Sequence, residues 1–159
     1  MTQEHATRSV EDAAALVDEM FIGVETACSP LKTINILGPK VIVSDFGNNG
    51  GLILGPAIEG WRERPMTDLP CETFIENNSV GRATAAYLPG GTPLASVAFL
   101  LGHAAARGRP LKAGQLVSTG AATGVHEIEI GQSACIDFGP DGAIACRAVA
   151  AQPVLAATR

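Results

Sequence analysis

Turn-forming residues divide this sequence into short apolar runs, and their spacing constrains the fold more than any other feature. The 159-residue chain contains 18 glycines and 10 prolines. Clusters such as Gly47–Gly51 (GNNGG) and Gly139–Gly142 (GPDG) separate runs that are too short to form long helices. This pattern favours strands joined by tight turns over a helical bundle.

Several of these runs have the composition of strands. Phe21–Ala27 (FIGVETA) is expected to form one strand. Val41–Phe46 (VIVSDF) and Leu52–Gly55 (LILG) are expected to form two more, on either side of the glycine-rich loop. Two hairpins are also predicted, Cys71–Ala86 with a turn at ENNS and Ser133–Val149 with a turn at GPDG.

Two helices are expected among these strands. Ser9 followed by Asp12 resembles a capping box that opens the first helix. The second is predicted over Pro93–Arg107, with Thr92 as its N-cap. Its apolar residues recur every three or four positions, but Phe99 lies off that stripe, so burial on two sides is expected. The sequence therefore predicts an α+β roll or sandwich.

The chain is interpreted as a single domain over residues 1–159, with a flexible tail at 150–159. The chain has a net charge of −5, and its sequence contains no basic stripe, which argues against nucleic-acid binding. No apolar run is long enough to span a membrane, and the N-terminal residues lack the apolar region of a secretion signal. The four cysteines are scattered without a C-x-x-C pair, as expected for reduced thiols in a cytoplasmic protein.

Residues 117–132 (VSTGAATGVHEIEIGQ) contain a first candidate site. On an extended strand, Glu127 and Glu129 would point to the same face, where carboxylates could bind a divalent cation. His126 would point to the other face. The alternative is an exposed polar face that alternates with apolar residues, namely Val125, Ile128 and Ile130.

The loop Ser44–Gly51 and the residue Glu25 are two further candidate sites. The loop Ser44–Gly51 (SDFGNNGG) permits close backbone approach, so its amides could bind an oxyanion or a carboxylate, with Asp45 orienting the loop. An ordinary glycine-rich turn is the alternative. Glu25 lies among apolar neighbours, and burying it would be costly unless it were paired, hydrogen-bonded or bound to a metal. An exposed edge position or a salt bridge is the alternative there. No catalytic triad or phosphate-binding loop is evident.

The order and spacing of four segments resemble the C-terminal part of the 2-keto-4-pentenoate hydratases (2-hydroxypenta-2,4-dienoate hydratases). These enzymes belong to the fumarylacetoacetate hydrolase-like superfamily, as do the 4-oxalocrotonate decarboxylases. The likeness runs from Val10 to about Val149. The segments are SDFGNNGGLILG, GGTPLASVAFLL, ARGRPLKAGQLVSTGA and GQSACIDFGPDGAIACRAV.

The resemblance implies a fumarylacetoacetate hydrolase-like mixed β-roll or sandwich with two main helices, without the N-terminal part of the family fold. It also implies a Mg²⁺ or Mn²⁺ ion held by carboxylates and chelated by the carboxylate and 2-oxo oxygens of the substrate. A hard cation prefers such oxygen ligands and polarises the 2-oxo group. Glu25 matches one of the family's metal ligands.

The resemblance also assigns substrate-binding residues. The family loop similar to ADNASSGG matches Ser44–Gly51, which implies substrate contacts for Asp45, Asn48 and Gly50. In this loop, asparagines at positions 48 and 49 take the places of serines. Thr119 and Gly120 match a TG pair beside the family's substrate pocket. We assign no catalytic residue from the sequence.

The function implied is that of a metal-dependent lyase, which adds water to a 2-hydroxy-2,4-dienoate in aromatic or steroid catabolism. Decarboxylation of a 2-oxo acid and fumarylacetoacetate-type C–C hydrolysis are alternatives. The family's Glu-x-Glu metal ligands, and an earlier Lys and Asp, have no counterparts before Glu25. A non-catalytic split or degenerate subunit is therefore a further alternative. A homo-oligomer, or a hetero-oligomer with a full-length hydratase or decarboxylase, is expected.

Overall fold

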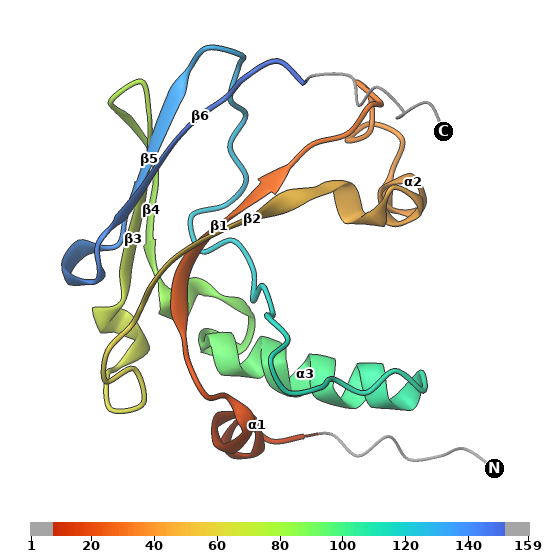
Figure 1. Ribbon diagram of the computed structural model, residues 1–159, viewed down its shortest axis with the longest axis vertical. Coiled ribbons are helices and arrows are strands. Elements are labelled where there is room, and N and C mark those ends of the chain that lie inside the picture. The colour runs from red at the N-terminus through yellow and green to blue at the C-terminus, as the bar shows by residue number, and fades with distance from the viewer. Residues whose placement is uncertain (1–7, 152–159) are drawn as a thin grey trace, which may run out of the picture.

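The computed structural model describes residues 8–151, so most of the tail predicted to be flexible lies outside the described residues. Within that range, strands form two antiparallel sheets (Figure 1). The first is a two-stranded ribbon of β1 (Phe21–Ala27) and β2 (Asn49–Ala57). The second has the strand order β4-β3-β5-β6. Its strands are β3 (Pro70–Ile75), β4 (Asn78–Thr84), β5 (Ser133–Asp137) and β6 (Ala143–Arg147).

Both predicted hairpins are confirmed. In the turn between β3 and β4, Glu76 and Asn77 have φ values of 48° and 65°, the left-handed geometry that tight hairpin turns require. A short helical turn at Gly139–Asp141 closes the hairpin of β5 and β6. Pairing of β3 with β5, with Thr73 opposite Ile136, joins the two hairpins into one sheet.

The strand predicted at Val41–Phe46 is wrong, because the chain forms the helix α2 (Pro39–Ser44) there. Gly38 has a φ of 84° and ends the preceding segment, and Pro39 occupies the first helical position. The fixed φ of proline suits that position. The valines and isoleucine favour a strand by composition, but the Gly-Pro step starts a helix first.

The extended strand predicted through Glu127 and Glu129 is also absent from the described residues, which have no strand between α3 and β5. The predicted alternation fails as well, because Val125 is 84% exposed. Side chains hold this segment instead. The Thr73 and Thr123 hydroxyls lie 2.9 Å apart, and the His126 ring lies against Gly81 of β4. β4 is an edge strand, yet these contacts, and not backbone pairing with its free edge, hold the segment beside it.

The two predicted helices are confirmed, α1 as Val10–Leu16 and α3 as Pro93–Ala106. The capping box of α1 is complete. The Asp12 N–H donates to the Ser9 hydroxyl over 3.0 Å, and the Ser9 N–H donates to the Asp12 carboxylate over 3.1 Å. α1 packs against α3 through Ala13, which has no exposed surface.

Burial of α3 on two sides is not observed in the described part of the chain. Leu94 and Val97 are buried, whereas Phe99 is 68% exposed and stacks on the His103 ring with centroids 5.2 Å apart. None of the described helices is both long and apolar enough to cross a membrane.

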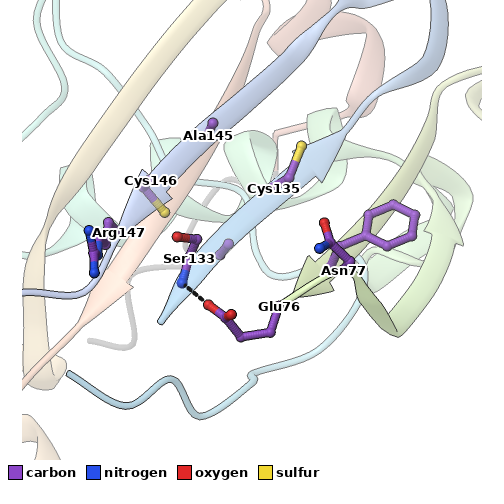
Figure 2. A pocket seen from close by; sticks show the side chains of 9 residues that line it. Glu76, Asn77, Ser133, Cys135, Ala145, Cys146 and Arg147 are labelled. Carbon is purple, nitrogen blue, oxygen red and sulfur yellow. Dashed lines mark hydrogen bonds between the residues drawn. The ribbon is translucent and has the colours of Figure 1, made fainter. Parts of the chain in front are cut away.

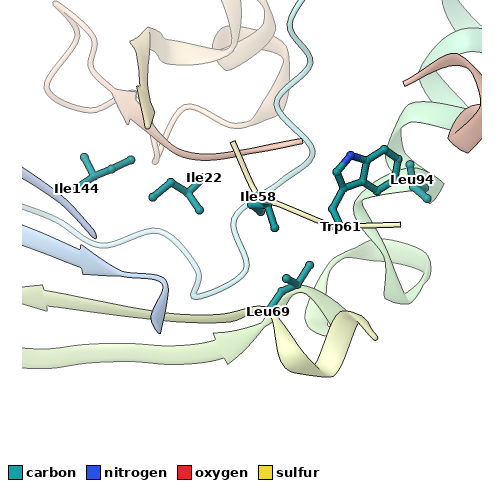
Figure 3. Close-up of a cluster of buried hydrophobic side chains, with 6 residues drawn as sticks. All are labelled: Ile22, Ile58, Trp61, Leu69, Leu94 and Ile144. Atoms are coloured by element: carbon teal, nitrogen blue, oxygen red, sulfur yellow. The ribbon is translucent and has the colours of Figure 1, made fainter. Parts of the chain in front are cut away.

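The main core joins the ribbon to the larger sheet and to α3. Figure 3 shows its buried side chains, which come from β1, from β6, from α3 and from the connection between β2 and β3. They are Ile22, Ile58, Trp61, Leu69, Leu94 and Ile144. An ion pair between Arg64 and Asp141 links the same connection to the turn between β5 and β6. This packing fixes β1, the strand that carries Glu25, relative to the rest of the fold.

The four cysteines are free, and two of them differ sharply in surroundings. Cys28 is exposed, whereas burial in β3, helped by the Asp137 carboxylate, raises the pKa of the Cys71 thiol to about 11. Because the thiolate is the nucleophile, iodoacetamide at pH 8 is expected to alkylate Cys28 and to leave Cys71 largely unmodified. Peptide mass mapping of a timed reaction measures both rates. Equal rates for the two cysteines would contradict the assigned surroundings of Cys71.

Candidate metal and substrate site

Glu25 lies on the exposed face of the β1–β2 ribbon. Ile22 is buried at the base of β1, while Glu25 is exposed and pairs with Leu52 of β2. The exposed position, one of the alternatives for this residue, is therefore the one observed. No salt bridge to Glu25 occurs in the described residues. Because the carboxylate is exposed, its charge does not need an ion-pair partner.

Two neutral side chains from other segments hold the Glu25 carboxylate. The Asn49 amide donates to Oε1 over 3.0 Å, and the Ser118 hydroxyl donates to Oε2 over 2.7 Å. The site thus gathers β1, the start of β2 and the segment that follows α3. Sequence reasoning selected the adjacent residues Asn48 and Thr119 and missed the two that make these contacts.

A β-bulge at Gly50 explains why Asn49 reaches Glu25. Thr26 pairs with Gly51 and Ala27 pairs with Asn49, so Gly50 is an extra residue in β2. Directly paired residues project from the same face of a sheet, and residues alternate between faces along a strand. Asn49 therefore shares a face with Ala27 and Glu25. Without the bulge it would project from the opposite face.

The remainder of the predicted loop is tightly wound. Phe46, Gly47 and Asn48 have φ values of 53°, 71° and 49°, all in the left-handed region. The Asn48 carbonyl accepts from the Cys28 N–H over 2.9 Å, which ties the loop to the end of β1. Asp45, at the other end of the loop, has a buried Oδ2 atom without a hydrogen-bond partner. Such an atom is costly and marks a place where a donor or a cation would be accommodated.

The segment with the predicted Thr119 and Gly120 is tied down on two sides. The Ser118 hydroxyl holds it to Glu25, and the Thr119 carbonyl accepts from the Ser96 hydroxyl of α3 over 2.9 Å. Gly120 has a φ of 120°, which a residue with a side chain rarely adopts. The structure thus links Glu25 to both predicted substrate-binding segments, through Asn49 on one side and through Ser118 on the other.

The polar groups that meet here are the Glu25 carboxylate, the Asn49 amide and the Ser118 hydroxyl. Their oxygen atoms suit a hard cation such as Mg²⁺. Of these three groups, Glu25 is the one carboxylate. Nowhere in the described part of the chain do three His, Cys, Asp or Glu side chains gather in a metal-binding group. The predicted Glu127 and Glu129 pair belongs to no such group. The described residues therefore fit one part of a Mg²⁺ or Mn²⁺ site.

A separate depression of about 610 Å³ lies at the end of the four-stranded sheet, between the turn of β3 and β4 and the strands β5 and β6 (Figure 2). Glu76 spans its edge and accepts from the Ser133 N–H. Arg147 donates to the Gly131 carbonyl over 3.0 Å. None of the predicted site residues lines this depression. The candidate site is therefore the exposed face around Glu25.

The antiparallel sheets and helices of this chain form an α+β fold that solved structures share. The solved structures that share it include 4-oxalocrotonate decarboxylase from Pseudomonas putida G7. Its complex with calcium and acetate matches with a TM-score of 0.76 and 24% identity. Its complex with magnesium and adipate matches with a TM-score of 0.77 and 23% identity. The predicted fold class is confirmed.

Each match covers 88% of this chain and 52% of the decarboxylase chain. This chain thus spans about half the length of the structures it resembles, as expected for a partial match. Comparison with known protein families and with curated proteins finds no match.

Proposed function

We propose that this chain forms part of a metal-dependent lyase of the 2-keto-4-pentenoate hydratase type, which adds water to a 2-hydroxy-2,4-dienoate. One observation carries the proposal. The carboxylate of Glu25, which the resemblance assigns as a metal ligand, is exposed and lies beside both segments assigned to the substrate. The solved structures support it, since they are complexes with a divalent cation and a carboxylic acid.

In this proposal Glu25 holds Mg²⁺ or Mn²⁺, and the metal polarises the 2-oxo group of the substrate. The Gly50 backbone, the Asn48 amide and the Thr119 hydroxyl meet the carboxylate end of the substrate. The buried, unpartnered Oδ2 of Asp45 would accept a hydrogen bond from the bound substrate. The Gly120 backbone, with its φ of 120°, lets the neighbouring Thr119 face the substrate.

The other acidic ligands come, in this proposal, from polypeptide outside the described residues. Mg²⁺ keeps its bound waters unless several oxygens converge, so Glu25 alone would hold it weakly. A second copy of this chain, or a full-length hydratase or decarboxylase, would supply them. The second candidate function is a non-catalytic subunit of such an assembly, and the single carboxylate at the site favours it. Decarboxylation is the alternative chemistry, favoured by the name of the solved structures.

Replacing Glu25 by alanine is expected to weaken Mn²⁺ binding in the presence of oxalate by at least tenfold, or about 1.4 kcal/mol. The reason is the loss of the carboxylate that the resemblance assigns as a metal ligand and that Asn49 and Ser118 hold in place. Isothermal titration calorimetry measures the affinity. The matched control is the double change Glu127→Ala and Glu129→Ala, which removes more charge at a distance and is expected to leave the affinity unchanged.

The opposite pattern, with loss in the double variant only, would show that the metal site is misplaced. If the unmodified chain binds no Mn²⁺, it is not a metal enzyme by itself. Addition of a full-length family hydratase then tests the subunit alternative, with formation of a stable complex by size exclusion as its expected result. Loss of dienol absorbance from 2-hydroxypenta-2,4-dienoate reports hydration. Release of CO₂ from a 2-oxo-3-enedioate reports decarboxylation.

A further inference from the structure

Glu25 differs from the other carboxylates that accept side-chain hydrogen bonds at both oxygens. Its partners lie 24 and 93 residues away in sequence, and both are neutral. In the described residues, the other two such carboxylates each have an arginine partner. Arg82 holds Glu72 and Arg64 holds Asp141. Those pairs join elements of the fold by opposite charge, whereas the bonds to Glu25 leave its charge unpaired.

Neutral donors have a specific consequence for a carboxylate. They fix its orientation without cancelling its charge, whereas an arginine would compete with a cation. An ionised carboxylate has about four lone-pair sites. One bond to each oxygen, from Asn49 and from Ser118, therefore leaves room for a cation on the same group.

The Ser118 bond also acts on the next residue. Thr119 follows directly, and its carbonyl is held by Ser96 of α3. The segment is thus fastened to β1 at Ser118 and to α3 at Thr119. Loss of the Ser118 bond would leave only the α3 attachment and would free the segment from Glu25.

We propose that Asn49 and Ser118 are positioning residues, which orient the Glu25 carboxylate toward a divalent cation and fix the Thr119–Gly120 segment at a set distance from it. The cation-orienting role rests on the proposed function. The fixing of Thr119–Gly120 does not, and it can be measured without metal.

The first test uses the metal-free chain. Ser118→Ala is expected to lower the backbone ¹⁵N order parameters of residues 118–120 from about 0.85 to below about 0.6. Ser118→Thr keeps the hydroxyl and is expected to restore them. Ser79→Ala is the matched control, because it removes a serine–glutamate bond of the same 2.7 Å length, to Glu72 on the other sheet. Unchanged order parameters in Ser118→Ala would overturn the proposal.

The second test measures Mn²⁺ affinity with oxalate by calorimetry. Asn49→Ala and Ser118→Ala are each expected to weaken binding by about 10–100-fold, the usual cost of losing a group that orients a metal ligand. Ser79→Ala and Ser118→Thr are expected to bind as the unmodified chain does. Equal thermal unfolding midpoints for all variants separate this effect from general destabilisation.

The two tests distinguish the inference from the proposed function. If the unmodified chain binds Mn²⁺ and both alanine variants bind it equally well, the cation-orienting role is wrong although the proposed function stands. If the chain binds no Mn²⁺ either alone or with a full-length family hydratase added, the proposed function and the cation-orienting role both fail. A fall in the order parameters of Ser118→Ala would then still establish the tether to Glu25.

Discussion

Replacing Trp61 by alanine is expected to lower the free energy of unfolding by about 3–5 kcal/mol. Trp61 is 5% exposed and packs in the cluster that joins the ribbon, the four-stranded sheet and α3 (Figure 3). The loss combines the transfer free energy of the indole with the cavity left behind. Urea denaturation followed by circular dichroism measures the change.

Two variants separate the contributions to this effect. Trp61→Phe keeps a ring in the cavity and is expected to lose clearly less than Trp61→Ala. Arg62→Ala removes the guanidinium that lies 4.2 Å from the centre of the indole ring and is expected to have a much smaller effect, since such exposed contacts contribute about 0.5–1 kcal/mol. A midpoint for Trp61→Ala equal to that of the unmodified chain would contradict the assignment of this cluster as the main core.

Features set by neighbouring residues could be predicted from the sequence. The capping box of Ser9 and Asp12 and the N-cap Thr92 depend on contacts within three residues, and both are present. The two hairpin turns depend on four-residue patterns, and both are correct. The two failures have different causes. At α2 the Gly38–Pro39 step starts a helix and overrides the strand propensity of the residues that follow. At Glu127–Glu129, side-chain contacts with residues distant in sequence hold the segment without strand pairing, which a local pattern cannot reveal.

The candidate site was likewise predictable from the sequence only in part. The resemblance led to β1, to the loop before β2 and to the segment after α3, and the structure brings these three together. It did not identify which side chains face Glu25. Selecting Asn49 over Asn48 requires knowledge of the bulge at Gly50. The bulge places Asn49 on the face of β2 opposite to the one that regular pairing would give it. A bulge depends on the register of two strands and leaves no distinct mark in a glycine-rich sequence.

Replacing Gly50 by alanine is therefore expected to disrupt the site from within the loop. A Cβ atom there would lie 2.6 Å from the Cys28 sulfur and 3.0 Å from the Thr26 carbonyl oxygen. The loop would have to move away from β1 and would carry Asn49 with it. We expect a stability loss of about 1–3 kcal/mol, typical of overpacking, measured by urea denaturation. If Asn49 orients Glu25, Mn²⁺ affinity should also fall at least tenfold, about 1.4 kcal/mol.

Replacing Cys28 tests whether crowding causes the expected losses of stability and Mn²⁺ affinity in Gly50→Ala. The sulfur is the closest of the three atoms that the added Cβ would meet and belongs to a side chain, whereas the Thr26 carbonyl oxygen belongs to the backbone of β1. Cys28→Ala alone is expected to bind Mn²⁺ normally, and Cys28→Ala combined with Gly50→Ala should recover part of the loss. Full recovery would mean that only the sulfur was in the way. Normal stability and affinity in Gly50→Ala would show that the loop has room to spare, and that the bulge does not hold Asn49 against Glu25.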